Sequence, residues 1–340
     1  MLDSGMPADP QQGPARAAIT AVATYVPDRV VSNNELAGIL DTSDEWIASR
    51  TGIRERRRAA PGETSSVMGA EAARRLMEHK GLSSRDVDAI IVATVTPDML
   101  FPATACLIQD RLGLENTWGF DLSAACSGFL FALTTGAQIV ASGVHRRVMV
   151  VGADTMSAII DPTDRTTAVL FGDGAGAVLL ERAEPGYGVL DFYHRVDGSG
   201  RNDLHMPGGG SLHPATAETV AAREHYLKQN GKVVFKFAVS KMAESIELLL
   251  QRNQLSPSDI AMVVPHQANQ RILDATADRL GLPHERMASV IGRYGNTTAA
   301  TLPLALEDSV NAGKIQRGDY VVLAAVGAGF TVGATLVRWQ

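Results

Sequence analysis

The sequence predicts a layered α/β protein made of two copies of one βαβ-rich unit. Self-comparison gives the first observation, because residues 82–116 (LSSRDVDAIIVATVTP to QDRLGLEN) resemble residues 255–284 (LSPSDIAMVVPHQAN to ADRLGLPH). Residues 120–154 resemble residues 291–329 in the same way, with small residues, a helical segment and a buried strand in the same order. The second observation is a set of short apolar runs, AIIVATV, VMVVGA, MVVP and VVLAAVG. These runs are too short for helices and do not alternate, which is typical of strands buried on both faces.

The order of these segments predicts four regions. Residues 1–16 are rich in Pro, Gly and Gln, and we expect a disordered tail there. Residues 17–184 and 236–340 are the two predicted halves, each a sheet covered by helices. Residues 185–235 are rich in Gly, His and Pro and have no counterpart near the C-terminus, so they are predicted to be a cap that shapes substrate entry. The functional site is expected where the halves meet.

The composition excludes several classes of protein. The 340 residues are 45% hydrophobic and 20% charged, which predicts a soluble globular protein with a large core. A formal net charge of −6 argues against nucleic-acid binding by a basic surface, although an acidic carrier protein could still bind a local basic patch. No apolar run has the roughly 18 uncharged residues of a membrane span. Only two cysteines are present, which argues against a disulfide framework and favours a reducing cytoplasm.

Cys126 is the first candidate site residue. It lies between a strand-like run and a helix predicted over Ser127 to Ser142, so its sulfur should meet the positive end of the helix dipole, a setting that favours thiolate. Small neighbours such as Gly128 leave room for a substrate. The alternative is a buried cysteine acting as a small apolar residue, which is the interpretation we give to Cys106 in the helical segment ATACLIQDRL.

His266 and Asn296 are the other candidates. His266 stands at the carboxyl end of the predicted buried strand IAMVVP, where α/β sheets present functional side chains, although a structural histidine would fit equally. Asn296, in RYGNTTAATLPLAL, roughly corresponds to the cysteine region of the first copy, with a helix N-cap as its alternative role. A pseudo-twofold would bring the two helix N-termini with Cys126 and Asn296 toward one cavity, and His266 would enter from the loop between them.

A cysteine, a histidine and an asparagine fit two chemistries. In papain-like proteases the histidine follows the cysteine by about 130–150 residues, and here Cys126 and His266 are separated by 266 − 126 = 140 positions. The local motif of that family is missing, however, and the cysteine is deep in the chain. The second chemistry is acyl transfer onto a thiol followed by carbon–carbon bond formation.

The second chemistry agrees with a family resemblance that runs from about residue 17 to the C-terminus. The sequence closely resembles β-ketoacyl-[acyl carrier protein] synthase III, a family of thiolase-fold condensing enzymes. The motifs that carry the resemblance occur in family order and are DTSDEWIASRTGIRER (41–56), AACSGF (124–129), DPTDR (161–165), FGDGAGAV (171–178), VPHQANQRI (264–272), GNTTAATLPLAL (295–306) and GAGF (327–330). The resemblance implies a thiolase-like fold with α-β-α-β-α layers.

The resemblance also implies roles for the candidate residues. Cys126 would be the acylated nucleophile, with His266 and Asn296 completing the triad and donating hydrogen bonds to the enolate that forms when malonyl-carrier protein loses CO₂. The backbone N–H groups of Cys126 and Ala328 would form a second oxyanion hole. No metal and no cofactor are implied, because the CoA thioesters are substrates.

Further residues are assigned only by this resemblance. Trp46 and Arg165 would hold the CoA adenine between an indole face and a guanidinium, and Arg50 would meet the CoA phosphates. Asn269 would help to fix the pocket. Lys232 stands near the pantetheine arm, where many relatives have asparagine.

Two residues concern partners. Arg271 would lie on the surface that binds acyl carrier protein. Phe101 matches a position at a homodimer interface that reaches the acyl pocket of the partner, and its bulk would favour a short primer such as acetyl.

The sequence therefore predicts a cytoplasmic acyltransferase that condenses a short acyl-CoA with malonyl-carrier protein in the first step of fatty acid synthesis. One alternative is a paralogue in secondary metabolism that primes a polyketide or transfers an acyl group to another acceptor. A non-catalytic partner subunit is the other, and the intact set of Cys126, His266 and Asn296 argues against it.

Overall fold

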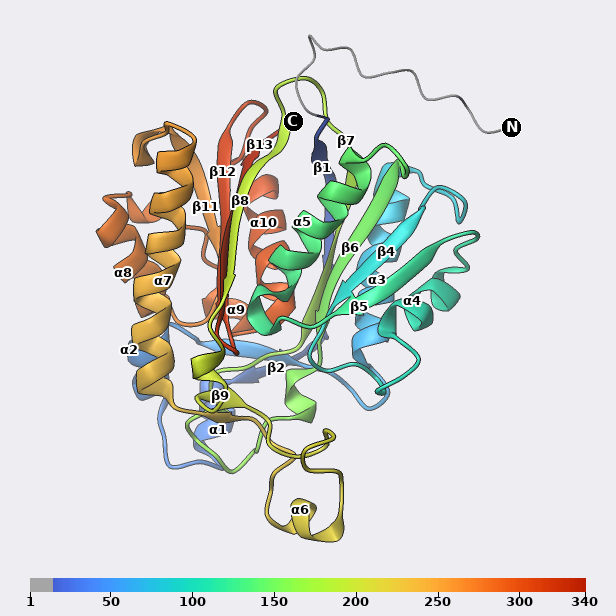
Figure 1. Ribbon diagram of the computed structural model, residues 1–340. Helices are drawn as coiled ribbons and strands as arrows, with labels where there is room; N and C mark the ends of the chain where they lie inside the picture. The colour runs from blue at the N-terminus through green and yellow to red at the C-terminus, as the bar shows by residue number, and fades with distance from the viewer. Residues whose placement is uncertain (1–14) are drawn as a thin grey trace.

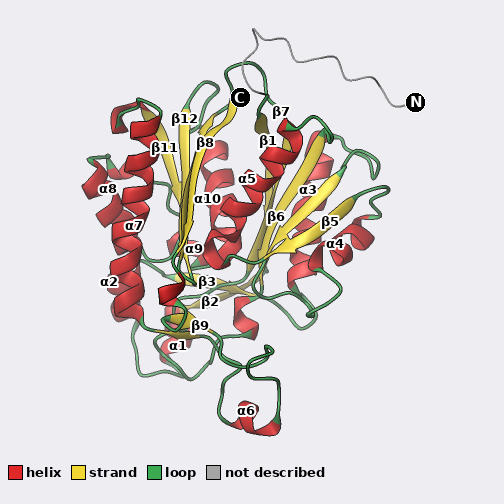
Figure 2. Ribbon diagram, in the orientation of Figure 1, coloured by secondary structure: helices red, strands yellow, loops and turns green. Residues whose placement is uncertain are grey.

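The computed structural model describes residues 15–340, so the predicted tail falls almost entirely outside the described residues. Two sheets stand face to face, with helices between them and on both outer faces (Figures 1 and 2). This arrangement confirms the predicted α-β-α-β-α layers.

The first sheet comes from the N-terminal half. In spatial order its strands are β1 (Ala17–Tyr25), β7 (Gly174–Arg182), β6 (Arg147–Asp154), β4 (Ala89–Ala93) and β5 (Trp118–Leu122). β4 is parallel to β5 and to β6, whereas β7 is antiparallel to β6 and to β1. The side chains of β4 and most of β6 are buried, as expected for strands covered on both faces.

The second sheet repeats this pattern with four strands. Their spatial order is β11 (Ile260–Pro265), β12 (Tyr320–Gly327), β13 (Thr331–Arg338) and β8 (Gly188–Val196). The first pair is parallel and the next two are antiparallel, as in the series β4, β6, β7 and β1. The predicted duplication therefore extends to strand order and direction.

Six long helices form the other three layers. Between the sheets lie α5 (Gly128–Ala141) and α10 (Thr301–Asn311), one from each half. The outer faces are covered by α3 (Ser65–Lys80) and α4 (Thr104–Leu112) on the first sheet, and by α7 (Gly231–Arg252) and α8 (Gln270–Leu280) on the second (Figure 1).

The central layer packs closely because small residues face it. At Gly152 of β6, a Cβ atom would lie 2.5 Å from the carbonyl oxygen of Ala299, so only glycine permits this approach between the halves. The same cluster of buried side chains includes Phe129, Leu130 and Leu302. The two halves therefore share one continuous core.

Shorter elements close the lower end of the layers in Figure 1. They are β2 (Arg29–Ser32), α1 (Asn33–Ala37), α2 (Asp44–Thr51), β3 (Glu55–Arg58), β9 (Leu204–His205), α6 (Ala217–Ala221), β10 (Lys228–Gln229) and α9 (Ile291–Tyr294). Within residues 15–340, six 3₁₀ turns join the elements, namely η1 (Ala125–Ser127), η2 (Met156–Ala158), η3 (Gly198–Gly200), η4 (Pro257–Asp259), η5 (His284–Arg286) and η6 (Thr298–Ala300).

The segment 185–235, predicted to be a cap, divides into different parts. Its first part forms β8, an edge strand of the second sheet, and its last residues begin α7. The strand was missed because GVLDFYHRV alternates apolar and polar residues on a half-exposed edge and contains no continuous apolar run. The part between β8 and α7 carries α6 and the paired strands β9 and β10.

No helix among residues 15–340 is long and apolar enough to cross a membrane. The same residues contain no cluster of three or more histidine, cysteine or acidic side chains suited to a metal ion.

Candidate active site

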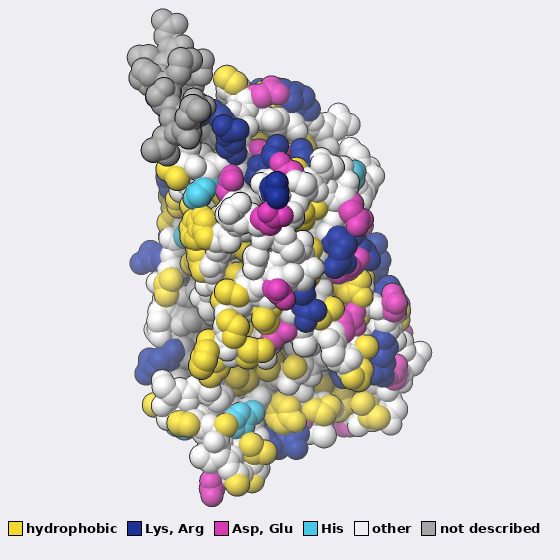
Figure 3. Space-filling model, turned by 90° about the vertical axis from the view of Figure 1, so that its right-hand side faces the viewer, with side chains coloured by type: hydrophobic (Ala, Val, Ile, Leu, Met, Phe, Trp, Pro, Cys, Tyr) yellow, Lys and Arg dark blue, Asp and Glu magenta, His cyan; other side chains and the backbone are white. Residues whose placement is uncertain are grey.

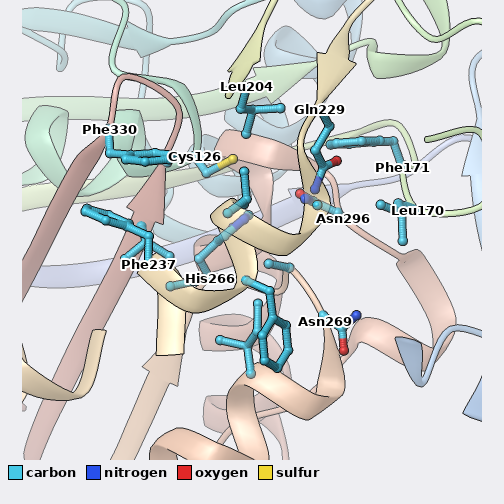
Figure 4. A pocket seen from close by; sticks show the side chains of 18 of the residues that line it. Cys126, Leu170, Phe171, Leu204, Gln229, Phe237, His266, Asn269, Asn296 and Phe330 are labelled. Carbon is cyan, nitrogen blue, oxygen red and sulfur yellow. The ribbon is translucent and has the colours of Figure 1, made fainter. Parts of the chain in front are cut away.

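A cavity of about 190 Å³ lies where the two central helices begin. Cys126, His266 and Asn296 all line it, although they come from three separate segments of the chain (Figure 4). The structure thus brings the three predicted residues together. The rest of the wall is mainly apolar and includes Phe237 and Phe330.

Cys126 lies in η1, immediately before α5, as the sequence predicted. The preceding Ala125 has a left-handed backbone with a φ of 49°, which turns the chain sharply from β5 into the helix. Burial, to which the negative charge of Asp154 adds, raises the pKa of the Cys126 thiol to about 12. The sequence analysis expects the helix terminus to favour a thiolate, and burial of the sulfur opposes that effect by favouring the neutral thiol.

His266 follows the last residue of β11 and is fully buried. Its Nδ1 lies 2.7 Å from the hydroxyl of Thr301, which is also within 2.9 Å of the carbonyl oxygen of Thr298. Burial lowers the pKa of His266 to about 3, so the imidazole is neutral and carries one proton. The Thr301 hydroxyl has one proton and donates it to Thr298 O in the structure, so a neutral His266 donates to that hydroxyl from Nδ1. If the hydroxyl rotates to donate to Nδ1 instead, the imidazole proton lies on Nε2 and can be donated to a substrate oxygen.

Asn296 is held by its backbone and by one end of its amide. Its N–H donates to Leu170 O at 2.9 Å, and its Oδ1 accepts the N–H of Thr298 at 2.9 Å. The amide nitrogen Nδ2 is left to face the cavity (Figure 4). A neutral thiol, a neutral imidazole and an amide donor in an apolar wall suit covalent acyl transfer and the stabilisation of an oxyanion.

The end of β12 lies directly against the backbone at Cys126. A Cβ atom at Gly327 would lie 2.9 Å from the backbone nitrogen of Cys126 and 3.0 Å from that of Ser127. Ala328 follows Gly327, and both Cys126 and Ala328 line a second cavity. The two residues that the sequence analysis expects to form an oxyanion hole therefore line one cavity.

This second cavity has a volume of about 140 Å³ and is mainly apolar. Its wall includes Val95, Met156, Ile159, Met206 and Leu227. Leu204 of β9 lines both cavities, so the β9 and β10 pair contributes to the wall between them. An apolar pocket lined by Cys126 is suited to an acyl chain.

Asp154, at the end of β6, is a buried residue near the site that the sequence analysis missed. Its Oδ2 accepts the N–H of Ala299 at 3.0 Å, and its Oδ1 accepts from Val95 N at 2.8 Å and from the Thr96 hydroxyl at 2.9 Å. Burial raises the pKa of Asp154 to about 6. The carboxylate therefore ties the first half to η6 of the second half.

The three residues expected at the CoA nucleotide lie together on the surface. The guanidinium carbons of Arg50 and Arg165 are 5.1 and 4.9 Å from the centre of the Trp46 ring. For a purine to stack between the indole ring and a guanidinium, the two groups must be about 7 Å apart, which is the sum of two contacts of about 3.5 Å. Arg165, which is also bound to Asp41, must therefore move by roughly 2 Å to admit an adenine.

Asn269 and Lys232 differ in their relation to the cavity. Asn269 lines it, caps α8 by accepting the N–H of Arg271 at 2.9 Å, and donates to Arg50 O at 3.1 Å. Asn269 thus links α2 to α8 at the rim of the cavity. Lys232 is exposed in the first turn of α7 and does not line the cavity.

Arg271 and Phe101 lie on the outer surface. Arg271 is exposed, with its guanidinium carbon 5.4 Å from the centre of the Phe235 ring. Phe101 is 83% exposed in the loop before α4, next to Leu100, which is 84% exposed. Hydrophobic side chains gather on the face that carries β5 and α4 (Figure 3).

The prediction that Cys106 is a buried apolar residue is wrong. Cys106 is exposed on α4, whereas Ala105 and Ile108 face the sheet.

Comparison with known proteins places these features in one family. A family model described as 3-oxoacyl-[acyl-carrier-protein] synthase III matches residues 120–198, and a model of its C-terminal part matches residues 250–339. A β-ketoacyl-[acyl-carrier-protein] synthase III of Koribacter versatilis is 53% identical over 95% of this chain and 98% of its own length. The enzyme of the same name from Chlorobaculum tepidum is 55% identical over 96% of this chain and 100% of its own length.

Solved structures show the same similarity. The crystal structure of β-ketoacyl-[acyl carrier protein] synthase III from Thermus thermophilus superposes with a TM-score of 0.89 at 44% identity, covering 95% of this chain and 99% of the other. The priming β-ketosynthase of the R1128 polyketide pathway has a TM-score of 0.89 at 36% identity, covering 98% of this chain and 99% of the other.

Proposed function

The chain belongs to the β-ketoacyl-[acyl-carrier-protein] synthase III family, and we propose that it uses acetyl-CoA as its primer and Cys126, His266 and Asn296 as its catalytic residues. As a member of this family it is an acyltransferase, and it catalyses the condensation that initiates fatty acid synthesis. The observation that carries the proposal is the convergence of the three side chains on one apolar cavity (Figure 4).

The first half-reaction loads Cys126. The sulfur attacks the carbonyl carbon of acetyl-CoA, the bond from that carbon to the CoA sulfur breaks, and the thiol proton ends on the released CoA. The carbonyl oxygen becomes negative during the attack and accepts hydrogen bonds from the N–H groups of Cys126 and Ala328.

The second half-reaction forms the new carbon–carbon bond. Malonyl-carrier protein loses CO₂ and becomes an enolate, whose oxygen accepts hydrogen bonds from His266 Nε2 and Asn296 Nδ2. The carbanion attacks the thioester carbon, and the bond from that carbon to the sulfur of Cys126 breaks. The product is a 3-oxoacyl-carrier protein, and Cys126 takes up a proton.

The size of the cavity behind Cys126 supports a short primer. An apolar cavity of about 150 Å³ in another protein holds one benzene molecule, and the cavity here is about 140 Å³. An acetyl group fits with room to spare, whereas a long acyl chain requires the wall to move.

Several surface residues complete the proposal. Trp46 and Arg165 hold the CoA adenine, Arg50 meets its phosphates, and Asn269 and Lys232 lie along the path of the pantetheine arm. Arg271 contributes to binding of acyl carrier protein. The chain is a cytoplasmic homodimer, and two largely exposed apolar residues, Leu100 and Phe101, support a partner at that loop.

Intact-protein mass spectrometry tests the proposal. We expect acetyl-CoA to add one acetyl group to Cys126, and malonyl-carrier protein to remove it with release of CO₂. Removal by another acyl acceptor, but not by malonyl-carrier protein, would favour the polyketide or secondary-metabolism alternative. The absence of any adduct would contradict the proposed nucleophile.

A further inference from the structure

Most polar side chains of the catalytic cavity already have a hydrogen-bond partner in the protein. His266 has Thr301, Thr166 has Asp164, Asn269 has Arg50, and Asn296 has the N–H of Thr298. Gln229 differs, because its amide makes no hydrogen bond to any residue of the described range 15–340. Its Oε1 is buried without a partner.

The position of Gln229 directs this amide toward the substrate path. Gln229 ends β10 and pairs with Leu204 of β9, so the two side chains lie on the same face of the antiparallel pair. Both point into the cavity, and the amide of Gln229 lies beside that of Asn296 (Figure 4). Its other neighbours in the view are the apolar Leu170 and Phe171.

In the protein without a ligand, the amide of Gln229 lowers the stability of the folded state. A buried polar atom without a partner loses its water and gains nothing in return. An apolar residue of the same length, such as methionine, would avoid this loss. A bound ligand that donates a hydrogen bond to Oε1 would remove this cost and would explain why the residue is a glutamine.

The chemistry of the amide selects the part of the substrate. An amide oxygen needs a donor, and neither the acetyl group nor the ionised malonyl group carries an N–H or O–H. The pantetheine arm of CoA and of carrier protein does, because a secondary amide lies two methylene groups from its sulfur. Such an amide can donate its N–H to Oε1 of Gln229 and accept from Nε2, so both polar ends of each amide are satisfied.

We infer that Gln229 is a substrate-positioning residue that binds the pantetheine amide nearest the sulfur and so holds the thioester at Cys126. The inference rests on the proposed function and deepens it. Because the same arm delivers both substrates, Gln229 acts in loading and in condensation alike.

Two small acetyl donors test the inference directly. S-acetyl-N-acetylcysteamine carries the amide, whereas 2-(acetylthio)ethyl acetate has an ester oxygen in place of the N–H. Acetylation of Cys126 is measured for both by intact-protein mass spectrometry. We expect the wild-type protein to prefer the amide donor about tenfold, as for one net hydrogen bond.

Gln229→Met should reduce this preference to about one, and Gln229→Glu, which keeps an acceptor oxygen, should retain part of it. Leu204→Met is the matched control, because it alters the neighbouring wall without an amide and should slow both donors equally. Thermal unfolding of each variant identifies any loss of folded protein.

The results separate three outcomes. If Gln229→Met keeps the wild-type preference, the inference is wrong. If it raises the KM of malonyl-carrier protein but not that of acetyl-CoA, Gln229 binds the malonyl group and the inference is also wrong. If no thioester acetylates Cys126 in the wild-type protein, the proposed function is wrong, and the inference about Gln229, which rests on it, is wrong as well.

Discussion

The two halves have equivalent strands that end in different residues, and this difference distinguishes Cys126, the proposed nucleophile, from its counterpart in the second half. β6 ends at Asp154 and β12 ends at Gly327, and each strand end faces the first turn of the other half's central helix. The Asp154 carboxylate accepts the N–H of Ala299. Gly327 has no side chain, so nothing in this position covers the N–H of Cys126.

The backbone supports this correspondence. Ala125 and Thr298 both have left-handed backbones, with φ values of 49° and 52°. Counting from these residues, Ala299 corresponds to Cys126, and Asn296 corresponds to Ser123 rather than to the cysteine. In the second half, the N–H that follows this strained turn donates to the Asp154 carboxylate. In the first half, the equivalent N–H, that of Cys126, is the one we propose to bind a substrate oxygen.

The largest effect is expected when the nucleophile is removed. Cys126→Ala should abolish acetylation, because no other thiol lies in the cavity. The double variant with Ala299→Cys tests the comparison, since a thiol at the equivalent position lies beside the Asp154 carboxylate and should not restore loading. Intact-protein mass spectrometry checks both, and an adduct at position 299 would show that the halves are interchangeable.

Blocking the backbone N–H of Cys126 should have the next largest effect on the rate of acetylation. Gly327→Ala places a methyl group about 2.9 Å from the Cys126 nitrogen, and loss of one oxyanion donor costs about 10²–10³ in rate. Single-turnover acetylation measures the loss. Gly198→Ala is the control, because a Cβ there meets no atom within 4 Å; equal rates for the two variants would exclude the proposed oxyanion hole.

The pH dependence of Cys126 tests how burial and the helix dipole compete. With its pKa raised to about 12 by burial and by the charge of Asp154, the thiolate fraction should rise about tenfold per pH unit. Alkylation by iodoacetamide in a Cys106→Ala background should therefore accelerate about 100-fold from pH 7 to pH 9. A plateau near pH 7 would mean that the dipole dominates.

Asp154→Asn should change stability in a pH-dependent way. Burial raises the pKa of Asp154 from 3.8 to about 6, so between these values the folded protein binds a proton that the unfolded chain lacks. The contribution of Asp154 is then present below about pH 4 and is lost as the pH rises through about 6, a change of about 3 kcal/mol.

Urea unfolding of the wild-type and Asp154→Asn proteins at pH 4.5 and 7 measures about 2 kcal/mol of this change, the part that falls above pH 4.5. The variant should gain stability relative to the wild type at the higher pH. A constant difference between the two proteins would contradict the raised pKa.

The smallest effect is expected at the strained turn. Ala125→Gly relieves a left-handed conformation that is unfavourable for a residue with a Cβ atom, and should stabilise the protein by at most about 1 kcal/mol. Thermal unfolding measures the shift. A destabilised variant would indicate that the Ala125 methyl packs usefully in the acyl cavity, which it lines.

The sequence identified the residues that carry unusual chemistry at the ends of recognisable elements. Cys126 lies between a strand and a helix, and His266 follows a buried strand, so local patterns place both at the sheet edge. Gln229 was missed because β10 has only two residues and shows no periodicity. Cys106 was wrongly predicted to lie in the core. Its helix, α4, is short and has few apolar residues, so the sequence does not determine which side of the helix faces the sheet.

The sequence by itself determined the duplicated layers, because strand and helix periodicities and the repeat are properties of neighbouring residues. Only the tertiary structure decided the state of the site. The contact of Asp154 with Ala299 joins residues 145 positions apart, and the approach of Gly327 to Cys126 depends on the packing of two sheets. Burial likewise raises the pKa of Cys126 against the effect of the helix dipole, because desolvation depends on everything that surrounds an atom and not on its place in the chain.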